Sequence, residues 1–455
     1  METQLLSQYK NFLTPYVGYQ TVSSKKQRNP QGIRQNVNFL ETKFKAAGMD
    51  TQVWRTRKLN PIIFADHTFD LSLPTVLIYG HYDVVSVKAE DWTTPPYVLT
   101  EVNDYLQGRG ATDNKGQNAI HIVAVLELIK TGMLTCNVKF FLEGDEETGS
   151  VGMEEVIKKH KRDLKADYFL VSDGEMVGKI PVKELSLRGL ANLRVTVTTA
   201  KAPAHSGLAG GIIHNAAVEA AKIMASLFDE DGDIAIPGFY DGMDLKLIED
   251  PKTIANNEEL LANINLKELY GVKVLKAGKP HQRPCYKNPF TRNGLMPALE
   301  VMGNDAGNAS QGFTHIIPHE AVFGLNVRLV GTQKPAEMVS LIKRYLEHQA
   351  PSYVDLKIEN YMAADPIMLT LSEAMSEHLN TLIEKAYGRK PLIKYCGAGI
   401  PVVAHIRDIV GAQPILVPLA NDTCNMHGPD ENIGLFWVKA GLEFSTSFFS
   451  TPFPS

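Results

Sequence analysis

The sequence predicts an α/β protein with two parts: a larger domain with a mixed, largely parallel sheet flanked by helices, and an inserted ferredoxin-like α+β domain. Short continuous apolar runs alternate with helical stretches over residues 1–186, as expected for strands buried in a parallel sheet. Over residues 187–362 the order of segments becomes β-α-β-β-α-β, the ferredoxin-like pattern. The alternation of apolar strands and helices returns over residues 363–455. We therefore expect the domain boundaries after residues 186 and 362.

The helices and strands of the first part are predicted from hydrophobic periodicity and from the residues that typically end such elements. A helical pattern runs from about residue 4 to residue 49, and Gly48 suits a helix C-cap. Three runs rich in branched and aromatic residues predict strands, with a glycine-terminated helix over residues 114–132 between the first two. These strands are "TVLIYG" (75–80), "VKFFLEG" (138–144) and "ADYFLVSD" (166–173).

The inserted part and the C-terminal part are assigned in the same way. Strands are expected at 188–200, 295–303, 321–330 and 353–362, and helices at 215–229 and 334–349. Residues 230–292 form a polar insertion, containing Gly and Pro, that has no clear period. After it the α/β texture resumes with a helix at 372–388 and a strand at 413–419.

Bulk composition narrows the class of protein. A chain of 455 residues is too long for one ordinary core, and a net charge of −5 gives no reason to expect nucleic acid or an anionic membrane as partner. No window approaches the roughly 18 apolar residues of a membrane span. The cysteines are scattered, which is typical of reduced thiols, so we expect a soluble cytoplasmic protein: Cys136, Cys285, Cys396 and Cys424.

Acidic residues and histidines follow the predicted strands at their carboxyl ends. In open α/β sheets, ligands bind beyond these ends, so the side chains are expected to meet in one site. Five carboxylates in one cleft would repel one another unless cations compensate them. The residues are His81, Asp83, Asp113, Glu146, Glu147, Asp173 and His427.

Two divalent cations would remove that repulsion. Two histidines and three carboxylates can hold two Zn²⁺ ions, with Asp113, in a glycine-flanked turn, as the bridging ligand: His81, Asp113, Glu147, Asp173 and His427. Asp83 can then fix the tautomer of His81, and Glu146 can act as general base. Each of these residues alone would be read as a solvated loop residue, whereas the ordered set is very unlikely to arise by chance.

The motifs resemble, in order and over nearly the whole chain, those of one di-zinc metallopeptidase family. That family includes aminoacylase, carnosinase-type and other cytosolic dipeptidases, glutamate carboxypeptidase, acetylornithine deacetylase and succinyl-diaminopimelate desuccinylase. The dipeptidase branch is the most similar. The motifs are "GHYDVV", "GRGATDNKGQ", "EGDEETGS", "SDGE", "AHSGLAGG" and "MHGPDENI".

The resemblance implies how the metals are shared. His81 and Asp173 would hold one zinc, Glu147 and His427 the other, and Asp113 would bridge them. Mn²⁺ or Co²⁺ could take the place of zinc.

The resemblance also assigns roles in the smaller domain, which in the family is a lid that forms a homodimer. His205 would reach the partner subunit's site and stabilise the oxyanion, and Arg328 would bind the substrate carboxylate. Two positions depart from the family pattern. Asn114 stands where a second aspartate is usual, and Gly399 stands at the position of a serine that helps to bind the substrate carboxylate, so that contact does not carry over directly.

We therefore expect a metallo-dipeptidase in which metal-bound hydroxide, generated with Glu146 as base, attacks the amide carbonyl. Two alternatives remain: an N-acyl-amino-acid deacylase, and a catalytically inactive relative that binds metal or peptide. The expected partners are a small peptide or N-acyl amino acid and a second copy of the chain, with neither nucleic acid nor membrane.

Overall fold

The computed structural model describes residues 2–24, 27–279, 282–307, 312 and 314–454, which form two compact units. Unit 1 comprises residues 1–185, 369–393 and 400–455, and unit 2 comprises residues 186–368 and 394–399. Unit 2 is therefore inserted in sequence into unit 1 and also takes in a short segment from the C-terminal part of the chain.

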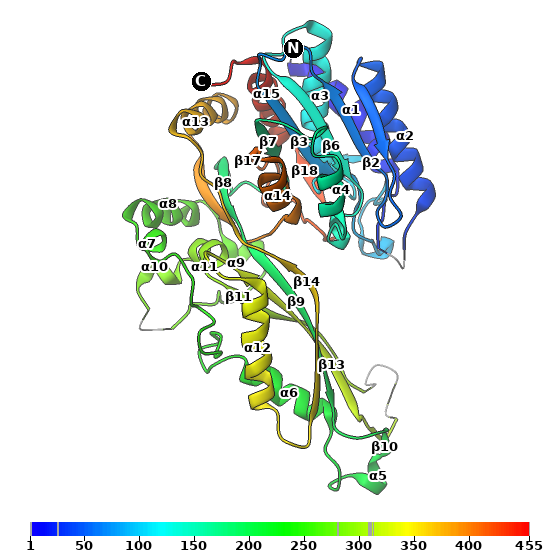
Figure 1. Ribbon diagram of the computed structural model, residues 1–455, viewed down its shortest axis with the longest axis vertical. Coiled ribbons are helices and arrows are strands. Elements are labelled where there is room, and N and C mark those ends of the chain that lie inside the picture. Colours follow the sequence, from blue (N-terminus) through cyan, green and yellow to red (C-terminus); the bar gives the residue numbers. More distant parts are fainter. Residues whose placement is uncertain (1, 25–26, 280–281, 308–311, 313, 455) are drawn as a thin grey trace. The chain divides into compact units, whose positions relative to one another are not determined.

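Unit 1 is built on a mixed sheet whose central strands are parallel (Figure 1). The edge hairpin and β8 run antiparallel to their neighbours, so the predicted mixed sheet is confirmed, with parallel pairing confined to its central strands. Strands β15 (Ile367–Met368) and β16 (Leu392–Cys396) also pair with β8. The order in the sheet is β1 (Asp50–Trp54), β2 (Ile62–His67), β6 (Asn137–Glu143), β3 (Thr75–His81), β7 (Tyr168–Val171), β17 (Gln413–Leu416) and β8 (Val182–Leu187).

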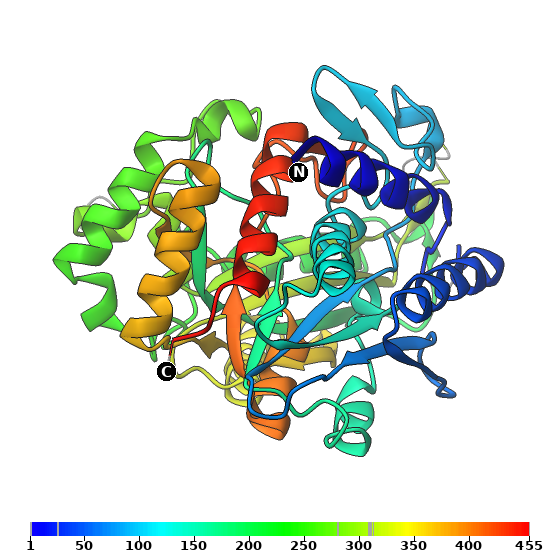
Figure 2. The same cartoon turned by 90° about the horizontal axis from the view of Figure 1, so that it is seen from above.

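Helices cover this sheet and bury their apolar faces against it. Helix α15 (Leu435–Ser450) packs between α13 (Glu373–Tyr387) and α3 (Lys115–Thr131), as Figure 2 shows from above. All residues of β6 are buried, which explains why its sequence reads as a continuous apolar run rather than an alternating one. Shorter helices α4 (Met153–Lys159) and α14 (Pro401–His405) pack against each other.

The N-terminal helical pattern is divided into two helices. Helix α1 (Glu2–Gly18) is followed by α2 (Pro30–Ala46), because the Asn29 side chain accepts a hydrogen bond from the Gly32 N–H and Pro30 supplies the first helical residue. Strands β1 and β2 were not predicted. Their hairpin forms the edge of the sheet beside β6.

Unit 2 contains a four-stranded antiparallel sheet in the order β11-β13-β9-β14. Two helices follow the first and third strands, so the chain order is β-α-β-β-α-β and the predicted ferredoxin-like topology is confirmed. Alternate residues of β9 and β13 are buried against these helices, which gives the alternating pattern seen in the sequence. The elements are β9 (Gly189–Thr198), α6 (Ala216–Ser226), β11 (Ala298–Asp305), β13 (Glu320–Leu329), α12 (Pro335–Gln349) and β14 (Asp355–Ala364).

The polar insertion in unit 2, for which the sequence shows no clear period, contains short helices separated by turns and irregular segments. Its longest helix is α8 (Pro251–Ala262), where Asp250 caps the N-terminus and a proline occupies the first turn. The shorter helices are α7 (Leu245–Ile248), α9 (Leu266–Leu269), α10 (Pro284–Lys287) and α11 (Pro289–Leu295).

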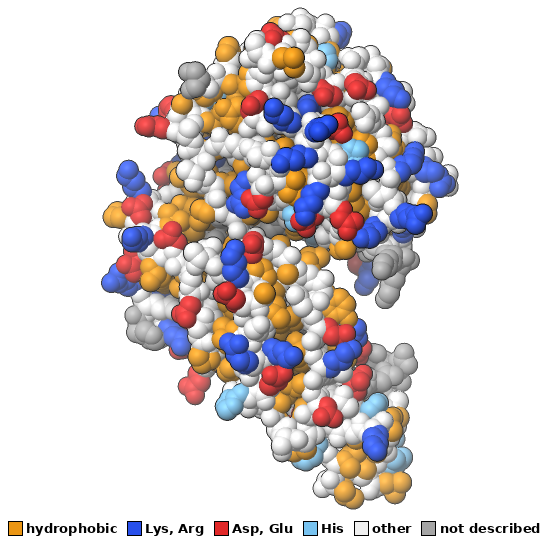
Figure 3. All heavy atoms as spheres, in the orientation of Figure 1, with side chains coloured by type: hydrophobic (Ala, Val, Ile, Leu, Met, Phe, Trp, Pro, Cys, Tyr) orange, Lys and Arg blue, Asp and Glu red, His pale blue; other side chains and the backbone are white. Residues whose placement is uncertain are grey.

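The charges on the surface and the state of the cysteines agree with what the composition predicts. The face in Figure 3 mixes basic and acidic side chains over both units, in keeping with the net charge of −5. All four cysteines are buried, and none of them forms a disulfide. Among the described residues, no helix combines the length and apolarity needed to cross a membrane.

Candidate metal centre

Three of the five predicted ligands lie at the carboxyl ends of strands of the main sheet, and Asp113 and His427 lie in loops. His81 is the last residue of β3, and Asp173 lies two residues beyond β7. Glu147 lies in the short 3₁₀ helix η2 (Glu146–Thr148) that follows β6, and Asp113 lies in the loop before α3. His427 precedes β18 (Asn432–Gly434), which forms a small sheet with β5 (Tyr105–Gln107) and β4 (Thr100–Val102).

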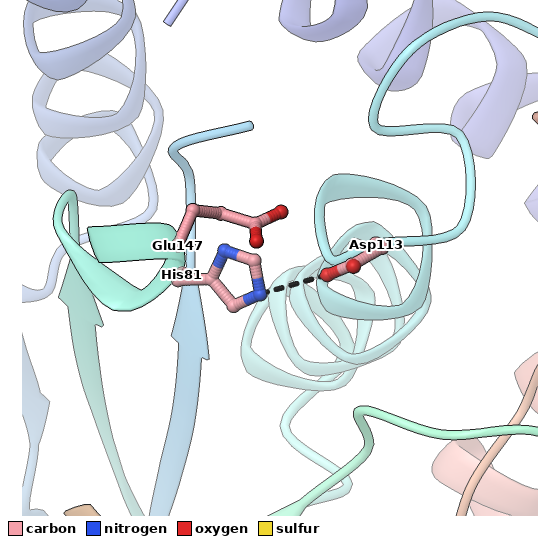
Figure 4. Close-up of side chains that lie close together, drawn as sticks. All are labelled: His81, Asp113 and Glu147. Carbon is pink, nitrogen blue, oxygen red and sulfur yellow. Dashed lines mark ion pairs between the residues drawn. The ribbon is translucent and has the colours of Figure 1, made fainter. Parts of the chain in front are cut away.

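Asp113 lies between the two histidines. Its Oδ1 is 2.9 Å from His81 Nε2, and its Oδ2 is 2.9 Å from His427 Nε2. On the first side, Asp173 Oδ2 lies 3.6 Å from His81 Nε2, and on the second side Glu147 Oε2 lies 3.1 Å from His427 Nε2. Figure 4 shows His81 and Glu147 pointing toward Asp113, and ligand atoms of these three residues lie within 4.8 Å of one another.

The chemistry of these donors fits a pair of divalent cations. Within the described part of the chain, the buried atoms His81 Nε2 and Glu147 Oε1 have no hydrogen-bond partner of good geometry. Buried polar atoms without a partner are costly, and coordination to a cation would satisfy both atoms. Imidazole and carboxylate donors suit Zn²⁺ and neighbouring transition metals, so these residues fit the ions implied by the sequence.

The pKa values of the ligand groups are shifted by burial and by the charged groups beside them. Burial raises the pKa of Glu147 to about 7, with the Asp113 carboxylate acting in the same direction. Burial also raises the pKa of Asp173, against the effect of the nearby His81. Hydrogen bonds to Asp113 and Glu147 raise the pKa of His427 to about 10. Cations in this place would therefore displace protons, which makes metal binding pH-dependent.

Glu146, the predicted general base, lies beside the ligands. Burial raises the pKa of its carboxyl well above the usual range; His81 opposes this shift, and the carboxylates of Asp173, Glu147 and Asp113 add to it. A cation pair would compensate those carboxylates and bring the pKa of Glu146 back toward a range suited to proton transfer at neutral pH.

Asp83 connects the two sides of the centre. Its carboxylate accepts hydrogen bonds from the backbone N–H groups of Glu146 (3.2 Å) and Glu147 (3.1 Å). The same carboxylate lies 3.4 Å from His81 Nδ1, which also lies 3.1 Å from the Asp83 carbonyl oxygen. Asp83 can therefore orient the His81 ring and, in addition, holds the turn that carries Glu146 and Glu147.

Asn114, the departure from the family pattern, has a contact that an aspartate could not make. Its Nδ2 donates to the Ser172 carbonyl oxygen and to Asp173 Oδ1, both at 2.7 Å. Since a carbonyl oxygen can only accept, the amide must present its NH₂ group here. Asn114 therefore orients Asp173, a role that sequence reasoning did not assign.

Three further residues near the centre were missed by sequence reasoning. Lys115 is fully buried and donates to the carbonyl oxygens of Tyr16 (2.8 Å) and Tyr19 (2.7 Å), so it ties the Asp113 loop to the end of α1. Arg109 and Glu431 form a buried ion pair. Both residues lie within the quoted motifs, but a separation of 322 residues leaves no local signal that they pair.

The remaining predicted site residues belong to unit 2. His205 ends β10 (Ala204–His205) with an exposed side chain, and its Nδ1 accepts a hydrogen bond from the Gly207 N–H. Arg328 is half-buried in β13 and donates from Nε to Asn326 Oδ1 at 3.1 Å. Gly399 lies near Arg328, because a Cβ atom added to Gly399 would be 3.9 Å from Arg328 Nη1.

A cluster of histidines and acidic residues beside the strand ends of a mixed sheet is typical of a metal-dependent hydrolase. The chain matches the model of "Peptidase family M20/M25/M40" over residues 77–450 and belongs to this family. The resemblance drawn from the ordered motifs is thereby confirmed.

Two relatives and two solved structures illustrate the match. The chain is 29% identical over 398 residues to the rat "Beta-Ala-His dipeptidase", covering 86% of this chain and 79% of the relative. It is also 29% identical over 402 residues to the "Cys-Gly metallodipeptidase dug1" of Schizosaccharomyces pombe, covering 86% and 82%.

Human carnosine dipeptidase 1 shares the fold with a TM-score of 0.83 at 24% identity, over 99% of this chain and 97% of that one. An M20 family metallo-carboxypeptidase from Sulfolobus solfataricus gives a TM-score of 0.84 at 24% identity, over 97% and 98%.

Proposed function

We propose that this protein is a metal-dependent dipeptidase that hydrolyses the amide bond of dipeptides or small peptides. The observation that carries the proposal is the position of Asp113, whose two oxygens face the two histidines. This is the arrangement expected of a carboxylate that bridges two cations. Relatives that are named as dipeptidases support the choice of substrate.

The metal ligands are proposed as two sets that share Asp113. His81 and Asp173 hold one ion, and Glu147 and His427 hold the other. Zinc is the proposed metal, with two ions per chain and Mn²⁺ or Co²⁺ as alternatives. When bound, the pair polarises the amide carbonyl and lowers the pKa of water.

Glu146 supplies the proton transfers. Its carboxylate takes a proton from the attacking water as the water oxygen bonds to the amide carbon. The same group returns the proton to the leaving nitrogen when the C–N bond breaks. Asp83 keeps Glu146 in place through the backbone N–H that it accepts.

Unit 2 is proposed to bind the substrate and to close over the site as a lid. Arg328 is the proposed partner of the substrate carboxylate. Among the described residues, its guanidinium has no carboxylate within 4.0 Å and donates only to Asn326 Oδ1. His205 has an exposed ring and is proposed to stabilise the oxyanion in the site of a partner subunit within a homodimer. The four cysteines form no disulfide, which supports a cytoplasmic location.

The test is hydrolysis of three substrate classes by metal-reconstituted and chelated protein: free dipeptides, N-blocked dipeptides and N-acetyl amino acids. The proposal requires chelator-sensitive cleavage of free dipeptides. Preference for acylated substrates would assign the protein as a deacylase. No cleavage at full metal content would identify an inactive binding relative.

The role of Glu146 is tested separately with Glu146→Gln. This variant should lose at least about 100-fold in kcat, because general base catalysis contributes about 10²–10⁴-fold, while metal content stays at the wild-type level. Glu154→Gln is the matched control, since Glu154 is an exposed residue paired with Lys158. Wild-type turnover by Glu146→Gln would exclude the proposed mechanism.

A further inference from the structure

We propose that Arg109 and Glu431 are a positioning pair that fixes the loop of Asp113 against the loop of His427 and thereby sets the metal affinity of the centre. The inference rests on the metal centre of the proposed function and assigns a role to two residues that touch neither substrate nor metal. It follows from where the hydrogen bonds of this buried ion pair go.

Glu431 organises the loop that carries Asp113. Its carboxylate is fully buried and accepts backbone N–H groups from Gly110 (3.0 Å), Thr112 (2.9 Å) and Asp113 (2.9 Å). The loop is therefore wrapped around one carboxylate, and the backbone of the proposed bridging ligand is fixed directly by it.

Arg109 holds the loop that carries His427. Its Nη1 lies 2.5 Å from Glu431 Oε2, and its Nη2 donates to the carbonyl oxygens of His427 (3.2 Å) and Gly428 (2.9 Å). The guanidinium also lies 5.2 Å from the centre of the Trp92 ring, which orients its plane. His427 has a φ of 62°, an uncommon backbone conformation for a residue other than glycine, so a bond to its carbonyl helps to maintain it.

A strand pairing brings the two partners together. Strands β5 (Tyr105–Gln107) and β18 are antiparallel, and the Gly108 N–H donates to the Glu431 carbonyl oxygen at 2.9 Å. Arg109 and Glu431 thus lie where this ladder ends and the two ligand-bearing loops begin. The ladder can hold the strands without the pair, but it does not reach Asp113 or His427.

Stability alone does not account for a buried ion pair, because its desolvation offsets most of its attraction. The hydrogen bonds of this pair go to the two loops that carry proposed ligands. Outer-shell partners of this kind typically change metal affinity or activity by about 10–100-fold when they are removed.

The test is equilibrium titration of the metal-free, full-length protein with Zn²⁺ against a competing chelator, and with Co²⁺ followed by its visible absorption. Glu431→Gln should weaken binding of at least one ion by about 10–100-fold. Arg109→Lys keeps the charge opposite Glu431 but lacks the planar fork that reaches both carbonyl oxygens. This variant should weaken the binding of one ion more than that of the other, and it should shift the absorption spectrum of bound Co²⁺.

Lys139→Gln is the matched control in the same unit. Lys139 is 8% exposed and donates to the carbonyl oxygens of Asp163 (2.7 Å) and Lys165 (3.0 Å), away from the ligand loops. Its loss should lower the free energy of unfolding without changing metal affinity. If Glu431→Gln does not fold, Arg109→Lys decides the question.

Wild-type isotherms and spectra in a folded pair variant would overturn the positioning role. So would an equal loss of metal affinity in Lys139→Gln, since the effect would then be general destabilisation. A wild-type protein that binds neither Zn²⁺ nor Co²⁺ would overturn the proposed metal centre itself, and that result is distinct from failure of the positioning role.

Discussion

Gly399→Ser, which introduces the residue usual in the dipeptidase branch, should destabilise this protein rather than add a substrate contact. A Cβ atom on Gly399 would lie 2.4 Å from the Arg188 carbonyl oxygen, about 1 Å closer than an ordinary van der Waals contact. Arg188 is held in place by two hydrogen bonds, so this carbonyl group cannot easily move away. The Arg188 N–H donates to the Ala398 carbonyl oxygen at 2.9 Å, and Arg188 Nε donates to the Gly397 carbonyl oxygen at 2.7 Å.

The expected loss is about 1–3 kcal/mol in the free energy of unfolding, the usual cost of forcing atoms into a filled space. Urea unfolding measures this loss of stability. KM for free dipeptides reports on substrate binding, and we expect it to be no lower than in the wild type. Gly303→Ser is the matched control in unit 2, because a Cβ placed at Gly303 in β11 would have no atom of the described residues within 4 Å, apart from its own chain neighbours. A Gly399→Ser variant with wild-type stability and a lower KM would refute the reasoning.

Two further predictions concern charge in unit 1. Burial raises the pKa of Glu143 to about 8, so the unfolded chain releases this proton from about pH 4.5 upward while the folded chain retains it until about pH 8. The free energy of unfolding should therefore fall across this window, and Glu143→Gln should gain stability relative to wild type between pH 5 and 8; parallel pH profiles from urea unfolding would contradict this. Removal of metal by a chelator should lower the melting temperature, because ions at 100 times their dissociation constant contribute about 2.7 kcal/mol. An unchanged melting temperature in calorimetry would contradict the proposed metal centre.

Sequence patterns were sufficient to predict those strands and site residues whose structure depends mainly on neighbouring residues in the chain. Strands β3, β6 and β7 are buried on both faces, so their continuous apolar runs were enough to predict them as strands. The polar residues just beyond these strands were enough to predict the position of the site. The edge hairpin of β1 and β2 and the helices of the insertion were not predicted. For α8, however, a signal was present in the sequence, because Asp250 followed by a proline is a typical helix start.

Long-range contacts could not be read in this way. The pairing of Arg109 with Glu431 depends on β5 and β18 meeting in space. The donor role of Asn114 depends on where β7 places Asp173. The absence of space at Gly399 depends on the course of the chain at Arg188. In each case the partner is fixed by tertiary structure, about which a one-dimensional pattern carries no information.

The strand order of unit 1 has a consequence for biosynthesis. Strand β17 lies between β7 and β8 and pairs with both, yet it is made more than 200 residues after them. Until the ribosome has produced it, the facing edges of β7 and β8 lack their partner, and such open edges invite wrong pairings. His427 emerges later still. The nascent chain therefore cannot complete this sheet until β17 has been made, and it cannot assemble the full set of proposed metal ligands until residue 427 has been made.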